Sequence, residues 1–355
     1  MSYQHLFARQ PTLDVVTAHA GGDVGCVILE GVSNLPGGTV SDRAEYLRRE
    51  ADGLRRMLIQ KPHGDPSQCV NLVVPPADPA ADAGLIIMGT MGYPDFSGSN
   101  AMCTMAALFG TGRLPMEEGE RRVVLETPSG SSELRVACHA GRLESVAYDA
   151  VPGFVLGEER RVVVEGWGEV SFSLVYGGVF YALITGVDIG LDPASAPVPE
   201  LKRFFEKFFA VVAPGLELRH PVRGHSAPLT LGLLVGEIDQ GPSTTSGVHV
   251  AAYMAPGVIC QSPTGTGTTA LLAWLAGQGR VSVGTTIRTI SPFGSEFNGT
   301  LAGLTTVGGV AGVQTVVSGR PYLLAHSSIV VDTEDPLVSD LGLGFSHILR
   351  QDQLE

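Results

Sequence analysis

Residues Cys260 to Val281 read CQSPTGTGTTALLAWLAGQGRV: a Ser-Pro turn and a loop of small residues lead into a segment that carries no charge before Arg280. Apolar residues on every side of a helix predict that it is buried on every side. Glycines 277 and 279 are expected to end this helix. Its N-terminus is rich in glycine and threonine, so free backbone N–H groups and the positive end of the helix dipole face whatever lies there. The pattern predicts an anion site that suits a small carboxylate.

The same pattern occurs earlier in the chain. Residues 97–114 align with residues 264–281 without a gap, at an offset of 264 − 97 = 167. The identical pairs are Gly98/Gly265, Ala106/Ala273, Leu108/Leu275, Gly110/Gly277, Gly112/Gly279 and Arg113/Arg280. Residues 127–131 and 291–295 also match after each copy. An internal repeat of this size predicts two similar halves, each with a buried central helix. We expect the two helix N-termini to face each other across a cleft, with Ser97 and Thr264 as opposed hydroxyls over one ligand.

Composition narrows the class of protein. With 355 residues the chain is long enough for two domains, and 44% hydrophobic with 17% charged residues is typical of a compact soluble protein. The formal net charge of −13 and the absence of a Lys/Arg cluster argue against nucleic-acid and anionic-membrane partners. We expect a small-molecule ligand, and a monomer or homodimer.

Cysteine usage and the N-terminus indicate the compartment. The cysteines are odd in number and scattered without a CxxC pair, which argues against a disulfide framework and against a metal site: Cys26, Cys69, Cys103, Cys138 and Cys260. No apolar run approaches membrane-spanning length. The segment Met1–Asp14 lacks a basic region followed by an apolar run, so no signal peptide is expected. We therefore expect a cytoplasmic protein.

Strand and helix signals alternate along both halves. The turn His19–Asp23 joins two short apolar strands, and Ser41-Asp42 is expected to cap a helix that runs to about Leu58. A helix from about Pro199 to Val212 carries four phenylalanines that we expect in the core. The crossing between halves is expected near Val151-Pro152-Gly153. The predicted domains are 1–155 and 156–332, with residues 333–355 as a candidate return to the first half.

Several motifs extend this interpretation over nearly the whole chain. They are His19-Ala20-Gly21-Gly22-Asp23, Leu35-Pro36-Gly37, Val74-Pro75-Pro76 with residues 78–82, Tyr176-Gly177-Gly178, residues 291–299, and above all Ser262-Pro263-Thr264-Gly265-Thr266-Gly267-Thr268. In these motifs the chain resembles the proline racemase family, which includes proline racemases, 4-hydroxyproline 2-epimerases and trans-3-hydroxy-L-proline dehydratases. The resemblance implies an α/β fold of two pseudo-symmetric halves like those of diaminopimelate epimerase. Each half is then a mostly antiparallel strand layer around a buried helix, with the active site between the halves and no cofactor such as pyridoxal phosphate.

The chain departs from the family at the reactive positions. The resemblance implies two catalytic cysteines, one for each face of the substrate α-carbon; here these positions are Ser97 and Thr264. The family's Asp four positions before the second cysteine is Cys260, and its His after the first Cys-Gly is Ser99. Cys103 is an alternative thiol, but it lies six residues beyond Ser97, on a different face of the helix.

Removing a proton α to a carboxylate needs a nearby base and donors for the developing enediolate charge. We predict Ser97 and Thr264 as the catalytic pair. The predicted substrate-binding residues are Gly98, Ser99, Asn100, Cys260, Gly265 and Thr266. Threonine is a poor second acid beside a thiol, whose ordinary pKa is about 8.5. This asymmetry favours one-sided chemistry, and in the family threonine at the second position goes with dehydration. The first hypothesis is therefore dehydration of 3-hydroxyproline to a pyrroline carboxylate, with Ser97 as base.

Two other hypotheses stay open. One is an isomerase that epimerises 4-hydroxyproline or racemises proline or a related amino acid, with Cys260 or water in place of the missing thiol. The other is a homologue that binds a small carboxylate without turning it over. At the level of single residues, Ser97 and Thr264 are also compatible with simple helix caps. Cys260 is compatible with a packed core residue or with a thiol acid or base that faces the cleft, and His19 with a turn-stabilising histidine or with a pocket wall.

Overall fold

The computed structural model describes residues 10–33, 35–157, 159–214, 216–224, 226–238 and 245–349. The segment in which no signal peptide is expected lies outside these residues as far as position 9, as do residues 350–355 of the predicted C-terminal return. Two compact units are present: unit 1 comprises 1–146 with 320–355, and unit 2 comprises 147–319. Within the described residues, no helix combines the length and apolar character needed to cross a bilayer.

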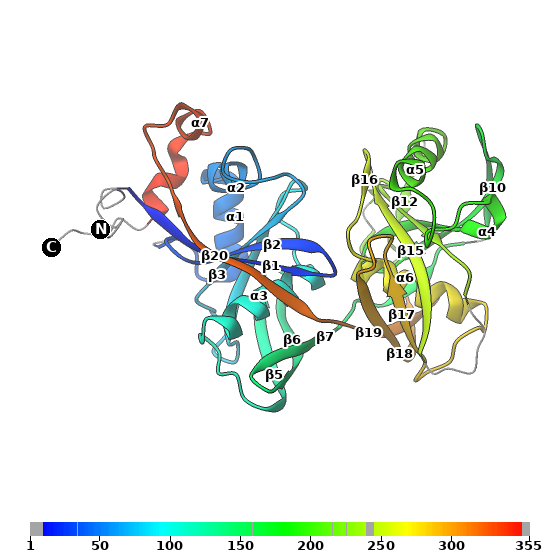
Figure 1. The fold of residues 1–355 in the computed structure, drawn as a ribbon, viewed down its shortest axis with the longest axis horizontal. Coiled ribbons are helices and arrows are strands. Elements are labelled where there is room, and N and C mark those ends of the chain that lie inside the picture. The colour runs from blue at the N-terminus through cyan, green and yellow to red at the C-terminus, as the bar shows by residue number, and fades with distance from the viewer. Residues whose placement is uncertain are drawn as a thin grey trace. The chain divides into compact units, whose positions relative to one another are not determined.

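The units end at other positions than the predicted domains, 1–155 and 156–332. The chain returns to unit 1 through strand β20 (Pro321–Val330), which pairs antiparallel with β1 (Thr12–Ala20) along its length. Figure 1 shows these two strands side by side. Because most of β20 is exposed, its sequence lacks the alternation that would mark it as part of a sheet.

Unit 1 is a mostly antiparallel sheet with two parallel pairings. Its elements are β1, β2 (Asp23–Glu30), α1 (Val40–Glu50), α2 (Gly53–Leu58), β3 (Cys69–Val74), β4 (Ala83–Met88), α3 (Gly98–Gly110), β5 (Gly119–Thr127), β6 (Gly130–His139), β7 (Arg142–Asp149), which crosses into unit 2, β20, α7 (Pro336–Ser339) and the 3-10 helix Leu343–Ile348. The parallel pairs are β2–β3 and β4–β5. Each is bridged by helical connections, as parallel neighbours require.

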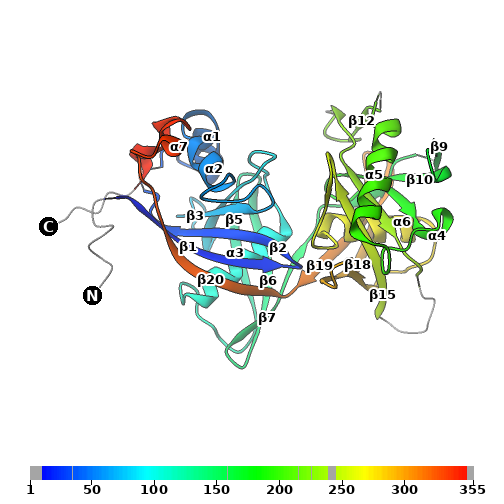
Figure 2. The ribbon, with the colours of Figure 1, turned by 45° about the horizontal axis from the view of Figure 1, so that its top comes forward.

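The helices of unit 1 form two groups, the central helix α3 and the pair α1 and α2. Helix α3 is the central one, with every residue from 100 to 109 buried. Helices α1 and α2 form a second core with the C-terminal segment, and Figure 2 shows α1, α2 and α7 gathered at one end of the unit. The helix predicted from Ser41 starts at Val40, because Thr39 forms a capping box with Asp42. It is interrupted at residues 51–52, between α1 and α2.

Unit 2 repeats this order of pairing. Its elements are β8 (Gly153–Val155), β9 (Arg160–Val164), β10 (Gly168–Tyr176), β11 (Phe180–Thr185), α4 (Gly186–Ile189), α5 (Val198–Val212), β12 (Leu218–Arg219), β13 (Ser226–Ala227), β14 (Leu231–Val235), β15 (Thr245–Met254), β16 (Val258–Ile259), α6 (Gly265–Gly277), β17 (Thr286–Ile290), β18 (Glu296–Val307) and β19 (Val310–Gly319). The β10–β11 hairpin is followed by a parallel β11–β14 pair, an antiparallel β14–β15 pair and a parallel β15–β17 pair.

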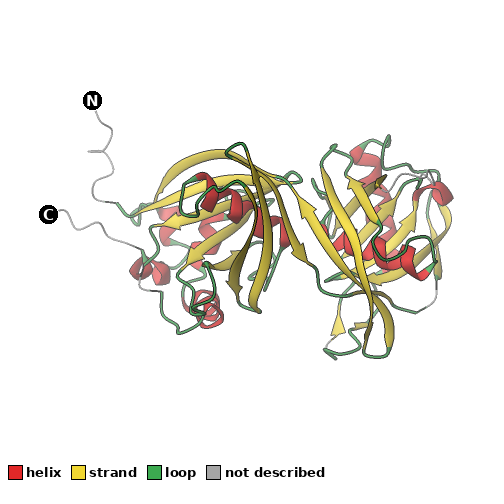
Figure 3. Cartoon of the chain, turned by 90° about the horizontal axis from the view of Figure 1, so that it is seen from below, coloured by secondary structure: helices red, strands yellow, loops and turns green. Residues whose placement is uncertain are grey.

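The repeat found in the sequence is thus a repeat of the fold. Helix α6 corresponds to α3 and is buried from Gly267 to Ala273 and at Leu275. Figure 3 shows helices enclosed by strands. Helix α5 lies on a separate core, where the four predicted phenylalanines are buried beside Tyr253. The expectation of two α/β halves, each with a mostly antiparallel strand layer around a central helix, is confirmed.

Candidate active site

In unit 1, the candidate base Ser97 occupies the N-cap position of α3. Its backbone is extended, with φ −149° and ψ 123°, yet its side chain makes no capping hydrogen bond. Instead, Ser97 Oγ accepts from Asn100 Nδ2 at 2.9 Å and lies 3.4 Å from Ser99 Oγ. Ser97 and Ser99 are both partly exposed. The Ser97 hydroxyl is therefore oriented by Asn100 and does not satisfy a helix amide.

The backbone of Asn100 accepts hydrogen bonds from residues that the sequence analysis did not single out. Its carbonyl oxygen accepts from Thr104 Oγ1 at 2.8 Å and from Asn71 Nδ2 at 3.4 Å. Asn71 lies on β3 and is fully buried, and its Oδ1 has no hydrogen-bond partner among the described residues. A buried amide in an otherwise apolar strand is the signal that could have drawn attention to Asn71.

The thiols of unit 1 lie in its interior. Cys103, the alternative to Ser97, is 1% exposed, and burial raises its pKa to about 12. Burial also raises the pKa of Cys69, against a hydrogen bond with Asn100. A thiol held protonated at neutral pH is a poor base. The structure therefore places Cys103 among the packing residues of α3.

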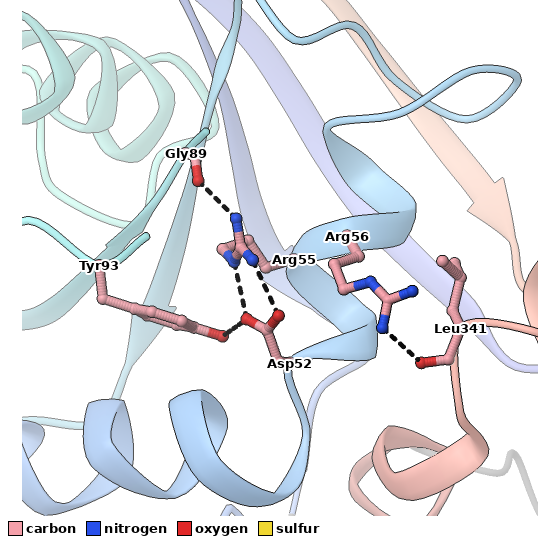
Figure 4. Close-up of polar contacts among 6 residues, drawn as sticks. All are labelled: Asp52, Arg55, Arg56, Gly89, Tyr93 and Leu341. Atoms are coloured by element: carbon pink, nitrogen blue, oxygen red, sulfur yellow. Dashed lines mark hydrogen bonds and ion pairs between the residues drawn. The ribbon is translucent and has the colours of Figure 1, made fainter. Parts of the chain in front are cut away.

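A polar network anchors the loop that leads to Ser97. Arg55 binds both carboxylate oxygens of Asp52, at 2.7 and 2.8 Å, and donates to Gly89 O at 2.8 Å. Tyr93 Oη donates to Asp52 Oδ1 at 3.0 Å, and Figure 4 shows these groups converging. Burial opposes ionisation of Asp52, but the bonds from Arg55 and Tyr93 outweigh it and lower the Asp52 pKa. Both ends of the segment 89–93 are thereby tied to α2.

In unit 2, Thr264 caps α6 in an unusual backbone conformation. Its φ is +60° with ψ 136°, which is a rare region for a β-branched residue. Its Oγ1 accepts from Gly267 N at 2.9 Å, and its own N–H donates to Ser262 Oγ at 3.0 Å. Such backbone strain costs about 1–3 kcal/mol, persists only where the surroundings enforce it, and clusters at functional sites.

Two phenols reach the first turn of α6. Tyr181 Oη lies 3.0 Å from Thr264 Oγ1 and 2.7 Å from Thr266 Oγ1. Tyr148 Oη lies 2.1 Å from the position that a Cβ at residue 265 would take, so only glycine fits there. Burial, reinforced by Tyr181, raises the pKa of Tyr148 and keeps this phenol protonated. Sequence reasoning missed both tyrosines because each comes from a strand remote from the helix in the chain.

Glycines bring the β10–β11 turn onto the same helix. A Cβ at Gly177 would lie 2.1 Å from Thr266 O, and one at Gly178 would lie 2.9 Å from Thr266 Cγ2. A Cβ at Gly267 would lie 2.4 Å from Thr264 Oγ1. The small residues of these two motifs are therefore required by the close approach of the backbone to α6.

Two further candidates have structural contacts. Cys260 follows β16, is half-buried against the α6 core, and donates its N–H to Ala252 O at 2.8 Å. His19 Nδ1 accepts from Gly22 N at 3.1 Å, and its ring stacks on Tyr322 at 5.2 Å. His19 is thus a turn-stabilising histidine.

The two helix ends share one electrostatic property. Neither α3 nor α6 has an acidic residue in its first turn, so the amides at Gly98, Ser99, Gly265 and Thr266 lie at uncompensated positive ends. Such ends bind carboxylates and stabilise oxyanions. In the part of the chain that the structure describes, no three His, Cys, Asp or Glu side chains gather as a metal site would require.

Comparison with known proteins finds similarity over most of the chain. The sequence model of the family described as proline racemase matches residues 15–342. A 4-hydroxyproline 2-epimerase of Allorhizobium ampelinum is 34% identical over 333 residues, which cover 92% of this chain and 93% of the epimerase.

Solved structures of named racemases and epimerases are also similar to the chain in sequence and in fold. A hydroxyproline epimerase from Agrobacterium vitis, solved with trans-4-hydroxy-L-proline, is 33% identical with a TM-score of 0.76, over 92% of this chain and 94% of that one. A probable proline racemase from Agrobacterium radiobacter K84, solved with carbonate, is 31% identical with a TM-score of 0.78, over 92% and 95%. A PhzF-family protein of Bacillus anthracis, 12% identical over 90% and 99% with a TM-score of 0.58, shares the fold.

Proposed function

The chain belongs to the proline racemase family, and we propose on that premise that it moves the proton at Cα of a proline-type imino acid without a cofactor. The reaction we place first is epimerisation of a 4-hydroxyproline at C2. The relatives named for this activity are similar to the chain over more than nine-tenths of its length.

One observation carries the proposal: each unit presents the same half-site. In both, a hydroxyl residue stands at the N-cap of a buried helix, followed by free amides with no acidic neighbour in the first turn. The amides would bind the substrate carboxylate and stabilise the enediolate that forms when the α-proton leaves. Ser97 and Thr264 are then the two candidate groups for moving the α-proton, one from each unit.

In this mechanism Ser97 removes the α-proton and Thr264 returns one to the other face. Asn100 donates to Ser97 Oγ, so the serine proton is left to point elsewhere and a lone pair is available for the substrate. Serine is a weak base, and it accepts the α-proton only after its own hydroxyl proton has passed to water. The positive end of α3 stabilises the alkoxide that is formed in this way. The reverse direction exchanges the two roles, as interconversion of epimers requires.

Dehydration of a 3-hydroxyproline is the second candidate, and Thr264 favours it. The Oγ1 of Thr264 already accepts from Gly267 N, so it is less available as a base than Ser97. In this reaction one base removes the α-proton, the 3-hydroxyl leaves as water, and the resulting enamine becomes the pyrroline carboxylate. Only one face of the α-carbon then needs a proton acceptor.

Product analysis separates these candidates. The wild-type protein would be incubated with each epimer of 3- and 4-hydroxyproline and of proline, and the products followed by proton NMR and chiral chromatography. We expect 4-hydroxyproline to lose its configuration at C2. Formation of a pyrroline carboxylate from 3-hydroxyproline alone would replace epimerisation with dehydration. Binding of pyrrole-2-carboxylate without any turnover would indicate a carboxylate-binding homologue.

A further inference from the structure

The two half-sites differ at one position on the strand beside each central helix. Gly25 on β2 is the first residue of the parallel pairing with β3, and Tyr181 on β11 is the first residue of the equivalent pairing with β14. Both face the central helix of their unit. A Cβ at Gly25 would lie 2.7 Å from Asn71 Nδ2 and 2.8 Å from Cys103 Cβ, so unit 1 has no room for a side chain there. In unit 2 the same position carries a phenol.

The phenol lies between two threonine hydroxyls of α6. Tyr181 is 1% exposed, and its Oη contacts Thr264 Oγ1 at 3.0 Å and Thr266 Oγ1 at 2.7 Å. A hydroxyl has one proton to donate and two lone pairs. These contacts are therefore directional once one bond in the chain is fixed.

The helix already uses one lone pair of Thr264 Oγ1, and either hydroxyl can be the donor in the bond between Thr264 and Tyr181. Gly267 N–H donates to Thr264 Oγ1 at 2.9 Å and occupies one of its lone pairs. When Tyr181 O–H donates to the other lone pair, the Thr264 proton points away from both partners. Thr266 O–H then donates to Tyr181 Oη. In this one of the two possible directions, the hydrogen bonds run from Thr266 to Tyr181 to Thr264 and leave the Thr264 proton for the substrate.

We propose that Tyr181 is a positioning residue for Thr264: it orients the threonine hydroxyl as a donor and replenishes its proton during the reaction. The inference rests on the proposed function, in which Thr264 protonates the α-carbon. As the new Cα–H bond forms, the Thr264 O–H bond breaks, and the Tyr181 proton moves to Thr264 Oγ1. The phenolate left behind accepts from Thr266. After the product leaves, Ser97 releases to water the proton that it took from the substrate, and water restores the proton of Tyr181.

The chemical advantage of this arrangement lies in where the negative charge is placed. An aliphatic hydroxyl is barely acidic, whereas a phenol ordinarily ionises near pH 10. Delocalisation into the ring makes the phenolate the better-stabilised anion. The tyrosine thus supplies an acidity that the Thr264 hydroxyl lacks. Unit 1, with glycine at the matching position, has no counterpart.

The test removes one oxygen atom. In Tyr181→Phe the ring packing is kept and the hydroxyl is lost, and Tyr253→Phe is the matched control. Tyr253 is equally buried in unit 2 but stacks on Phe205, in the α5 core. We expect Tyr181→Phe to lower kcat about 10²-fold with little change in KM, in line with general acid catalysis. The control should retain wild-type kcat and KM.

A second variant protein, Thr264→Cys, separates proton transfer from Tyr181 to Thr264 (the relay) from a merely structural role of Tyr181. In Thr264→Cys the thiol has an accessible proton of its own, so adding Tyr181→Phe should lower kcat less than about threefold. This non-additivity is the signature of two groups that act as one. An equal loss in both backgrounds would mean that Tyr181 only packs, and would overturn the proposal.

The outcomes for the relay and for the proposed function differ. Wild-type turnover of 4-hydroxyproline that Tyr181→Phe leaves unchanged would overturn the relay alone. A wild-type protein that turns over no proline of the panel would overturn the proposed function, and the relay with it. A large loss of kcat in Tyr181→Phe that Thr264→Cys suppresses would support both.

Discussion

Asn100 Nδ2 donates to Ser97 Oγ over 2.9 Å, and this side-chain bond takes the place of the capping bond that an N-terminal serine usually makes. Thr264, at the matching position of the repeat, does make the capping bond, to Gly267 N. The two N-cap hydroxyls are therefore held in different ways. The Ser97 hydroxyl accepts from the Asn100 side chain, whereas the Thr264 hydroxyl accepts from a backbone amide of its own helix.

This difference predicts unequal costs of removing the two hydroxyls. Ser97→Ala should lower the free energy of unfolding by less than about 0.5 kcal/mol, because no helix amide loses its acceptor. Thr264→Val, which keeps the branched shape, should cost about 1 kcal/mol because Gly267 N loses its partner. Urea denaturation of both variants beside the wild type measures this. Equal costs would show that Ser97 is a structural cap after all.

Replacing Thr264 by cysteine should shift the balance of reactions. A thiol ionises near neutral pH when tuned by a helix N-terminus, so Thr264→Cys gives the second face a competent acid and base. We expect the ratio of epimerisation to dehydration to rise at least about tenfold, since one unit of pKa corresponds to a factor of ten. Thr264→Ser serves as the control, because it keeps an aliphatic hydroxyl. A rise that Thr264→Ser reproduces would point to side-chain size instead of acidity.

Gly177, in the β10–β11 turn that contacts α6, should tolerate no side chain. In Gly177→Ala the new methyl would meet Thr266 O at 2.1 Å and Ala270 N at 2.7 Å, both backbone atoms. We expect a loss of about 1–3 kcal/mol of unfolding free energy, together with loss of turnover. Gly277→Ala is the control in the same unit, since its methyl would lie 3.7 Å from Val155 Cγ2. It should be neutral or stabilising, because alanine is the better helix former.

The buried Cys103 thiol predicts both protection from alkylation and a loss of stability at high pH. Burial raises the pKa of Cys103 to about 12 from an ordinary value near 9, so iodoacetamide should label Cys103 only after unfolding. The unfolded chain releases this proton at lower pH than the folded one. The stability contribution is therefore complete below about pH 9 and is lost as the pH rises towards 12. Mass spectrometry of labelled peptides and urea denaturation from pH 8 upwards check both points.

Cys260 provides the corresponding test for unit 2. With Ser97 and Thr264 as the catalytic pair, iodoacetamide should leave turnover largely intact. Rapid inactivation that pyrrole-2-carboxylate slows and Cys260→Ser abolishes would make Cys260 a catalytic thiol. Cys69→Ser is the matched control, because Cys69 is also half-buried and is the first residue of β3 in unit 1.

The sequence was most informative where a property is local. The repeat at residues 97–114 and 264–281 predicted two equivalent buried helices, because an uncharged helix has no face to turn to water. The four phenylalanines of α5 predicted their own burial in the same way. Glycine motifs marked the turns that approach α6, because close backbone contact excludes a Cβ.

What the sequence did not reveal depends on tertiary pairing. Tyr181 lies on β11, 83 residues before Thr264, and only the strand order brings its hydroxyl to α6. Asn71 likewise reaches Asn100 from β3. The return of β20 to unit 1 was placed too late because an exposed strand has no hydrophobic alternation. None of these contacts leaves a periodic signal along the chain.

Solvent-deuterium exchange tests the role of Ser97 in proton removal most directly. Each epimer of 4-hydroxyproline would be incubated in D2O with the wild type, Ser97→Ala or the control Ser67→Ala, whose exposed hydroxyl donates to Asp65. Proton NMR then follows the Cα signal. We expect the wild type and Ser67→Ala to exchange this proton, and Ser97→Ala to exchange it at least about 10²-fold more slowly, the usual contribution of a general base. Exchange at the wild-type rate in a folded Ser97→Ala protein would contradict the account, because the base would then lie elsewhere.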